Sequence, residues 1–285
     1  MAYRRRRPRE KSLRLLGYRS QFVHYACREP RATLVCFHGW LDNAASFAPL
    51  ADELKDYEIY AWDFLGHGKS EHKHAGERYH YIDLVPFIDA AWNSVSARRK
   101  VLVGHSMGAG ACSLYAGAEP KAVRELVLIE GFSLMTAESS EAAKILHEGI
   151  VGLKTAQELT KPKYETIDDA VKVRMRINAL SHGAALPLVK RATVQEKGRI
   201  TWRADFRLRA PSLMRMTSEQ VKNILEAIEA RVLVVLGEQG MPQLAQAAGE
   251  LGSMIRNMQL VKLPGHHHLH MEKSGVGEAI VRFLE

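Results

Sequence analysis

A serine between two glycines is the residue of this sequence best placed for chemistry. Residues 104–108 read G-H-S-M-G and fit the pattern G-x-S-x-G, which marks a nucleophile at a sharp strand-to-helix turn. An apolar run, residues 100–104, precedes Ser106, and a helical pattern, residues 107–118, follows it. So tight a turn predicts a positive φ at Ser106 and needs glycines where side chains would collide. The helix N-terminus and the free N–H of Met107 would favour negative charge beside the hydroxyl.

A serine hydroxyl needs a base to take its proton and a third group to orient that base. Residues 264–273 (PGHHHLHMEK) follow the last predicted strand and hold four histidines. These histidines, the candidates for the base, are His266, His267, His268 and His270. A histidine-rich tract can also bind a metal, but no carboxylate or cysteine is evident at ligand spacing. The sequence therefore predicts a base in this loop, and no metal.

Apolar runs alternate with helical patterns along the chain, which is typical of an α/β fold with a mostly parallel sheet. The expected strands are residues 13–18 and 21–26, as an antiparallel pair, then 33–37, 57–62, 100–104, 124–129, 231–236 and 258–263. The expected helices are residues 46–54, 81–95, 107–118, 218–230, 242–251 and 276–284.

This alternation stops after Glu130. Residues 132–212 are helical and polar in pattern, with one short extended piece at residues 198–206. An insertion of this size in a sheet protein is usually functional, and we expect a helical cap over the mouth of a site. The core would then consist of residues 13–131 and 213–285, with residues 1–12 as a basic, flexible arm.

Charge and cysteine content limit the binding partners and the cellular compartment that the sequence predicts. Residues 1–14 carry +6 of the formal net charge of +8, so the rest of the chain is nearly balanced. A basic arm can bind nucleic acid, but a solvated terminus is the expected state, and no nucleic-acid partner is predicted. No apolar run approaches the roughly 20 residues that span a bilayer, and none follows the basic start as in a secretory signal. Cys27, Cys36 and Cys112 form no CxxC pair, so reduced thiols and a cytoplasmic location are expected.

Four segments together resemble the α/β-hydrolase family, close to its serine hydrolase-like, esterase-type members. They are residues 38–47 (HGWLDNAASF), 63–70 (DFLGHGKS), 104–108 and 264–273. The resemblance implies the α/β-hydrolase fold, a mostly parallel, doubly wound, eight-stranded sheet with an inserted helical cap. It also implies that residues 63–70 form a structural turn.

The resemblance guides the choice of the base. In this family the catalytic histidine commonly precedes a glutamate by four or five residues. Counting back from Glu272, five residues select His267 and four select His268. We expect His267 to be the base, with His266 and His270 as hydrogen-bond donors around it.

The acid departs from the commonest family pattern, which places an aspartate in a G-E-x-D turn after the strand at residues 231–236. Residues 237–240 read G-E-Q-G, so the expected position is Gly240. Glu130 is the first choice, because the carboxyl ends of neighbouring strands lie side by side in a doubly wound sheet. Glu238 is the second candidate, and an absent acid is the third. Glu130 could instead cap the first helix of the insertion.

Two backbone N–H groups are needed to hold a developing oxyanion. Met107 supplies one, and the H-G-x turn at residues 38–40 implies Trp40 as the other. The expected reaction is two-step acyl transfer on a small-molecule carboxylic ester, without a cofactor. Carbon–carbon bond hydrolysis, peroxyacid formation, and amide or thioester hydrolysis on the same site stay open. So does a catalytically silent protein that binds a ligand or partner under its cap, which the missing aspartate at Gly240 favours.

Overall fold

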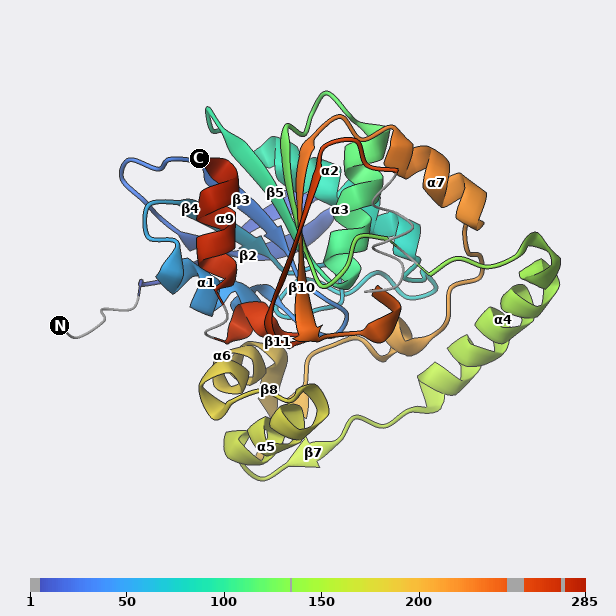
Figure 1. The fold of residues 1–285 in the computed structure, drawn as a ribbon. Coiled ribbons are helices and arrows are strands. Elements are labelled where there is room, and N and C mark those ends of the chain that lie inside the picture. The colour runs from blue at the N-terminus through green and yellow to red at the C-terminus, as the bar shows by residue number, and fades with distance from the viewer. Residues whose placement is uncertain (1–5, 134, 245–253, 273–274) are drawn as a thin grey trace.

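A mostly parallel sheet forms the centre of the computed structural model, which describes residues 6–133, 135–244, 254–272 and 275–285. Its eight strands lie in the order β1-β2-β4-β3-β5-β6-β10-β11 (Figure 1). Their bounds are β1 Arg9–Leu15, β2 Tyr18–Tyr25, β3 Thr33–Phe37, β4 Glu58–Trp62, β5 Lys100–His105, β6 Glu125–Ile129, β10 Arg231–Gln239 and β11 Met258–His266. All pairings from β4 to β11 are parallel, and β2 pairs antiparallel with both β1 and β4. The predicted doubly wound sheet is confirmed.

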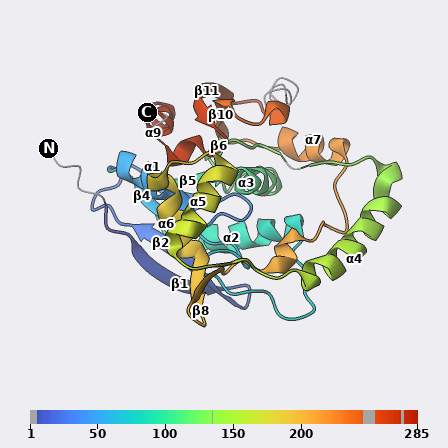
Figure 2. The same cartoon turned by 90° about the horizontal axis from the view of Figure 1, so that it is seen from below.

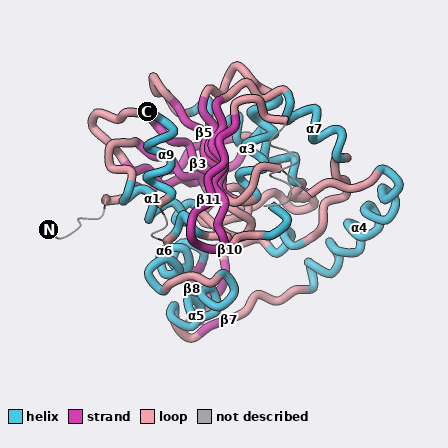
Figure 3. Tube along the Cα trace, viewed as in Figure 1, coloured by secondary structure: helices cyan, strands magenta, loops and turns pink. Residues whose placement is uncertain are grey.

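Helices cover both faces of this sheet (Figures 1 and 3). One face packs against α2 (Leu84–Ser94), α3 (Met107–Ala118) and α7 (Ser218–Glu226). The other face packs against α1 (Ala48–Glu53) and α9 (Val276–Leu284). Along β3, Val35 belongs to the first apolar core, whereas Leu34 and Cys36 belong to the second. Burial on both faces is why the central strands are continuous apolar runs rather than alternating ones.

The N-terminal strand is longer than expected. β1 begins at Arg9 and pairs with β2 over its whole length, so residues 9–12 are sheet and not arm. The Arg6 side chain is also held, because its guanidinium donates to backbone carbonyl oxygens that include those of Tyr25 and Tyr57, each at 2.8 Å. The prediction of a flexible arm over residues 1–12 is therefore wrong for residues 9–12 and for Arg6. Residues 1–5 lie outside the described residues.

The insertion between β6 and α7 contains helices and a second, small sheet. Its helices are α4 (Ala142–Glu158), α5 (Ile167–Asn178) and α6 (His182–Ala192), and its strands are β7 (Lys163–Tyr164), β8 (Thr193–Glu196) and β9 (Arg199–Trp202), in the order β7-β9-β8. α5 and α6 lie together near the carboxyl ends of the central strands, whereas α4 extends to one side (Figures 1 and 2). The extended piece expected at residues 198–206 contains β9, whereas β7 and β8 were not expected. Lys197 and Gly198, both at positive φ, form a tight hairpin turn between β8 and β9.

Short 3-10 helices complete the described structure. They are η1 Ala44–Phe47, η2 Tyr81–Asp83, η3 Ser139–Glu141, η4 Phe206–Arg209 and η5 Leu269–Met271. The helix predicted for residues 242–251 lies mostly outside the described residues. Within the described ranges, no helix combines the length and apolarity needed to cross a bilayer.

Candidate active site

Ser106 occupies a strained turn between β5 and α3. It is the residue before the first turn of α3, with φ 52° and ψ −116°. The positive φ predicted from the glycine spacing is confirmed, and it carries a cost for a residue with a side chain. The flanking glycines are required by close backbone contact. A Cβ at Gly104 would lie 2.6 Å from Ala109 N, and one at Gly108 would lie 2.3 Å from Phe37 O.

Three side chains form a continuous hydrogen-bonded series. His267 Nε2 lies 2.9 Å from Ser106 Oγ, and His267 Nδ1 lies 3.0 Å from Glu130 Oε2. Because a carboxylate only accepts, the ring hydrogen belongs on Nδ1, which leaves the Nε2 lone pair facing the serine hydroxyl. The structure thus brings together the three residues predicted from the sequence, in the arrangement that serine nucleophiles use.

The sheet explains how residues distant in the sequence meet. Ser106 directly follows β5, Glu130 directly follows β6, and His267 directly follows β11. β5 and β6 are neighbours, and β10 separates β6 from β11. All of these strands are parallel, so their carboxyl ends share one edge of the sheet, which faces downward in Figure 1.

Glu130 is buried and fully occupied as an acceptor. Its side chain accepts from Gly237 N at 2.6 Å and from Met241 N at 3.3 Å, besides the bond from His267. Burial raises the pKa of Glu130, but the hydrogen bonds from His267, Gly237 and Met241 outweigh it and leave that pKa below its ordinary value. Glu130 therefore stays a carboxylate at neutral pH and keeps the imidazole oriented.

The same carboxylate explains the glycine at position 240. A Cβ at Gly240 would lie 2.3 Å from Glu130 Oε1 and 2.6 Å from Oε2. An aspartate cannot fit there while Glu130 occupies the space. Glu238, the second candidate for the acid, is exposed on β10. The carboxylate that contacts His267 therefore comes from the end of β6, and the end of the neighbouring β10 carries a glycine.

The four loop histidines have different surroundings, and His267 is the one in contact with Ser106. His266 is exposed, and its Nδ1 lies 3.4 Å from Gln239 O. His268 is buried, and its Nε2 lies 3.3 Å from Asp42 Oδ2. Both ring nitrogens of His270 are buried without a hydrogen-bond partner among the described residues, so the predicted donor role of His270 is not seen.

His105 and Asp42 are residues beside the site to which the sequence assigned no role. His105 Nε2 lies 2.9 Å from the backbone oxygen of His267, so it must donate there. Burial lowers the pKa of His105 to about 4, which leaves its ring neutral near pH 7. His105 is the first of the two variable residues of the G-x-S-x-G motif, and Asp42 lies in one of the segments that carry the family resemblance. His105 Nδ1 lies 3.5 Å from Asp42 Oδ2, a contact that neither sequence position indicates.

Trp40 and Met107 line one cavity of about 180 Å³. Trp40 is half exposed rather than part of the core, and its Nε1–H donates to Leu208 O at 3.1 Å. Tyr81 Oη donates to Met107 O at 2.7 Å. The rest of the wall is mostly aromatic and apolar, with Phe64, Leu65, Tyr79, Leu84 and Phe87 among its residues. The cavity therefore suits an apolar group bound next to the turn that carries Ser106.

The turn at residues 63–70 is structural, as expected. Asp63 is fully buried and accepts from Ala44 N at 2.7 Å and from Lys69 N at 2.8 Å. The Arg191 guanidinium of α6 pairs with the same carboxylate at 2.7 Å. Asp63 thus joins the core to the insertion.

Known proteins match this chain over most of its length. Residues 32–274 match the family model described as "alpha/beta hydrolase fold". A serine hydrolase-like protein of Danio rerio is 24% identical over 264 residues, covering 88% of this chain and 81% of that protein. A probable serine hydrolase of Drosophila melanogaster is 29% identical over 273 residues, with 90% and 81% covered.

Solved structures agree. The crystal structure of a hypothetical protein from Pseudomonas aeruginosa PAO1 has a TM-score of 0.87 at 32% identity and covers 96% of both chains. A thioesterase domain from the curacin biosynthetic pathway has a TM-score of 0.82 at 24% identity, over 98% of this chain and 99% of that one. This similarity shows a shared fold and nothing further. With a family model that spans most of its residues and a sheet of the matching topology, the chain belongs to the alpha/beta hydrolase fold family, and it is similar to serine hydrolase-like proteins.

Proposed function

We propose that this protein is a serine hydrolase that cleaves a small-molecule carboxylic ester, with Ser106 as nucleophile, His267 as base and Glu130 as the orienting acid. The observation that carries the proposal is the unbroken series from Glu130 Oε2 through both ring nitrogens of His267 to Ser106 Oγ, at 3.0 and 2.9 Å. A serine hydroxyl, an imidazole base and a carboxylate that orients the imidazole are the three parts of a serine acyl-transfer triad.

The reaction proceeds in two halves. His267 Nε2 takes the hydroxyl proton as Ser106 Oγ bonds to the ester carbonyl carbon, and the N–H groups of Met107 and Trp40 hold the resulting oxyanion. Collapse of this intermediate breaks the carbon–oxygen bond, and His267 returns the proton to the leaving alcohol. His267 then takes a proton from water, whose oxygen attacks the acyl-enzyme, and the proton returns to Ser106 as the acid leaves. Glu130 stabilises the imidazolium in both halves.

The substrate is proposed to be small and partly apolar. The cavity beside Met107 is walled mainly by aromatic and aliphatic side chains and has a volume of about 180 Å³. Leu208, Ala210 and Ser212 of the insertion form part of that wall. We therefore assign the insertion, residues 132–212, the role of a cap that closes the acyl or alcohol pocket.

A covalent probe tests the proposal directly. A fluorophosphonate should label the wild-type protein at Ser106, and Ser106→Ala should abolish labelling. Ser94→Ala, which removes a hydroxyl at the end of α2, serves as the matched control and should label normally. An absence of labelling in the wild type, or equal labelling of Ser106→Ala, would refute the assignment. A panel of p-nitrophenyl esters and thioesters of increasing chain length then defines the substrate, with short acyl chains expected to react fastest.

The catalytically silent alternative loses its main support. That alternative was favoured by the glycine at position 240, where the family commonly has an aspartate. Glu130 fills the space next to Gly240 and contacts His267, so the glycine is accounted for without a loss of the acid.

A further inference from the structure

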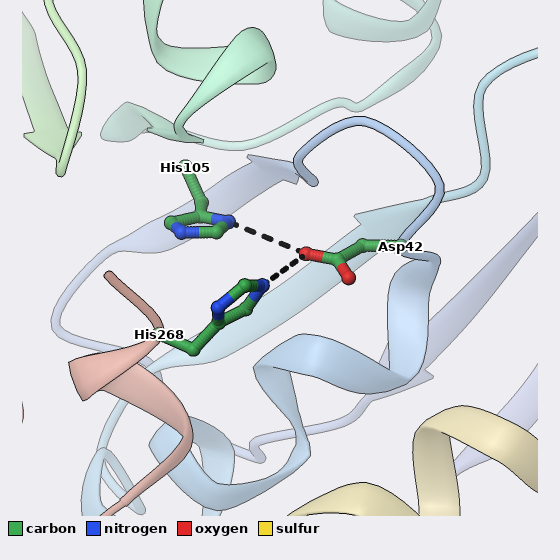
Figure 4. A group of neighbouring side chains, drawn as sticks. All are labelled: Asp42, His105 and His268. Atoms are coloured by element: carbon green, nitrogen blue, oxygen red, sulfur yellow. Dashed lines mark ion pairs between the residues drawn. The ribbon is translucent and has the colours of Figure 1, made fainter. Parts of the chain in front are cut away.

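We propose that Asp42, His105 and His268 form a binding site for one first-row transition-metal ion, for which Zn²⁺ is the reference. The three side chains converge on one point (Figure 4). They come from three separate segments, the loop after β3, the end of β5 and the loop after β11. One carboxylate oxygen and two imidazole nitrogens are a donor set that suits zinc.

The separations of the donor atoms fit a shared ion. Asp42 Oδ2 lies 3.5 Å from His105 Nδ1 and 3.3 Å from His268 Nε2, and all three ligand atoms lie within 4.8 Å of one another. Bond lengths of about 2.0–2.1 Å in a tetrahedral zinc site place neighbouring ligand atoms about 3.3–3.4 Å apart. The two separations from Asp42 Oδ2 match those between two ligands of one tetrahedral ion.

Proton counting at His105 supports the same conclusion. Its Nε2 must donate to the His267 carbonyl oxygen at 2.9 Å, so a neutral ring presents its Nδ1 lone pair to Asp42. Asp42 Oδ2 is also an acceptor, and both atoms are buried without a hydrogen-bond partner among the described residues. A cation between them satisfies both lone pairs. Donation of the second ring N–H to a backbone carbonyl is the usual arrangement of a metal-bound histidine.

The backbone beside the donor atoms carries no side chain. A Cβ at Gly39 would lie 2.9 Å from His105 Nδ1 and 3.1 Å from Asp42 Oδ2, so a side chain there would intrude on the donor atoms. His268 also lines a cavity of about 230 Å³ between the end of α5 and its own loop. Glu272 lines the same cavity, where its carboxylate accepts from Ser181 N and Ser181 Oγ. His268 is the one proposed ligand that this cavity reaches.

Arg174 sets the strength of the site. Its guanidinium bonds to Asp42 Oδ1, the carboxylate oxygen that the ion does not use. This positive charge repels a cation and cancels the charge of Asp42, which makes the ion exchangeable rather than permanent. Removing the charge should therefore strengthen metal binding, an outcome that a purely structural Asp42–histidine cluster would not give.

Calorimetric titration of the chelator-treated full chain with Zn²⁺, without an affinity tag, tests the site, and Co²⁺ gives a second readout by visible absorption. One equivalent of Zn²⁺ should bind, and Co²⁺ should give a d–d band. Asp42→Asn and His268→Gln should each weaken binding at least tenfold, and Arg174→Gln should strengthen it at least threefold. His266→Gln, an exposed histidine in the same loop, is the matched control and should stay within twofold of wild type.

Three results would overturn the proposal. These are less than half an equivalent of bound Zn²⁺, unchanged affinity in His268→Gln, or equal weakening in His266→Gln, which would mean a surface histidine site. Circular dichroism and thermal unfolding establish whether each variant folds. If Asp42→Asn does not fold, the affinity of His268→Gln decides the test. Because the readouts are binding and absorption, the test is independent of ester hydrolysis.

Discussion

Replacing Glu130 by glutamine keeps the shape of the side chain but exchanges one acceptor for a donor. Gly237 N–H, 2.6 Å away, requires an acceptor and holds the amide oxygen on its side. The amide NH₂ then faces His267 Nδ1, at a position now 3.0 Å from a carboxylate oxygen. Because NH₂ only donates, His267 must accept at Nδ1 and carry its hydrogen on Nε2. That hydrogen points at Ser106 Oγ, so the ring can no longer take a proton.

The size of the effect follows from this change of tautomer. In chymotrypsin-like serine proteases, the equivalent loss of the acid's charge lowers kcat by about 10⁴-fold. We expect Glu130→Gln to lower kcat by about 10³- to 10⁴-fold, which corresponds to roughly 4–5.5 kcal/mol of transition-state stabilisation. KM should change less than about threefold, because the change acts on the imidazole in the transition state. Glu130 is not part of the cavity wall.

Initial rates with a p-nitrophenyl ester, analysed for kcat and KM separately, provide the assay. Glu238→Gln is the matched control, since it makes the same exchange at an exposed position of β10 and should retain at least half of the wild-type kcat. The reasoning is refuted if Glu130→Gln keeps kcat within tenfold of wild type, or if Glu238→Gln loses as much.

A relocated acid tests the steric part of the argument. Gly240→Asp alone should impair both stability and activity, because its Cβ would lie 2.3 Å from Glu130 Oε1. Combined with Glu130→Ala, which clears that space, the same aspartate should raise kcat at least tenfold above Glu130→Ala alone. A double variant no more active than Glu130→Ala would show that position 240 cannot reach His267.

Three further predictions concern stability and can be measured by urea unfolding. Gly104→Ala should lower the free energy of unfolding by about 1–3 kcal/mol, because its Cβ would collide with the backbone of α3. In the control Gly183→Ala the nearest atom to the Cβ lies at 4.0 Å, so this change should be neutral or stabilising. Equal effects of the two changes would contradict the contact argument. Burial lowers the pKa of His67 to about 3, so the unfolded chain binds a proton that the folded chain does not, and His67 should account for about 2 kcal/mol of the stability lost between pH 7 and pH 5. Buried His105, whose pKa is lowered to about 4, adds to that loss, so His67→Gln should reduce the loss without removing it, and an unchanged loss would rule His67 out as a source. Arg191→Met leaves the buried Asp63 carboxylate without its cation and should lower the free energy of unfolding by about 3–5 kcal/mol. Adding Asp63→Asn should restore part of that loss. A loss below about 1 kcal/mol would show that the pair is dispensable.

Local patterns in the sequence were enough for the sheet and for the turn at Ser106. A strand buried on both faces must be apolar throughout, so β3, β5 and β6 are visible as uninterrupted runs. The glycines on either side of Ser106 reflect backbone contacts within one strand–turn–helix unit. The positive φ of Lys197 and Gly198 is equally local, but a Lys-Gly pair is a weak turn signal. The sequence therefore predicted an extended piece at residues 198–206, which contains β9, but not its partners β7 and β8.

The identities of the base and the acid needed more than local pattern. Four histidines crowd one loop, and the backbone path after β11 decides which ring faces Ser106. The resemblance to the family selected His267, and parallel neighbouring strands made Glu130 the better carboxylate. Gly240 has no side chain because Glu130, from the end of the neighbouring strand β6, fills the space beside it. Only the tertiary structure shows this contact.

The group of Asp42, His105 and His268 was decided by the tertiary structure alone. The sequence contains a histidine tract, but the carboxylate that meets it, Asp42, lies more than 200 residues earlier in the chain. Folding supplies one from the loop after β3, because β3 and β5 are neighbours in the sheet and end at the same edge as β11. Ligand spacing along a chain describes sites built from one segment, whereas donors on separate strand ends meet only through the order of the strands.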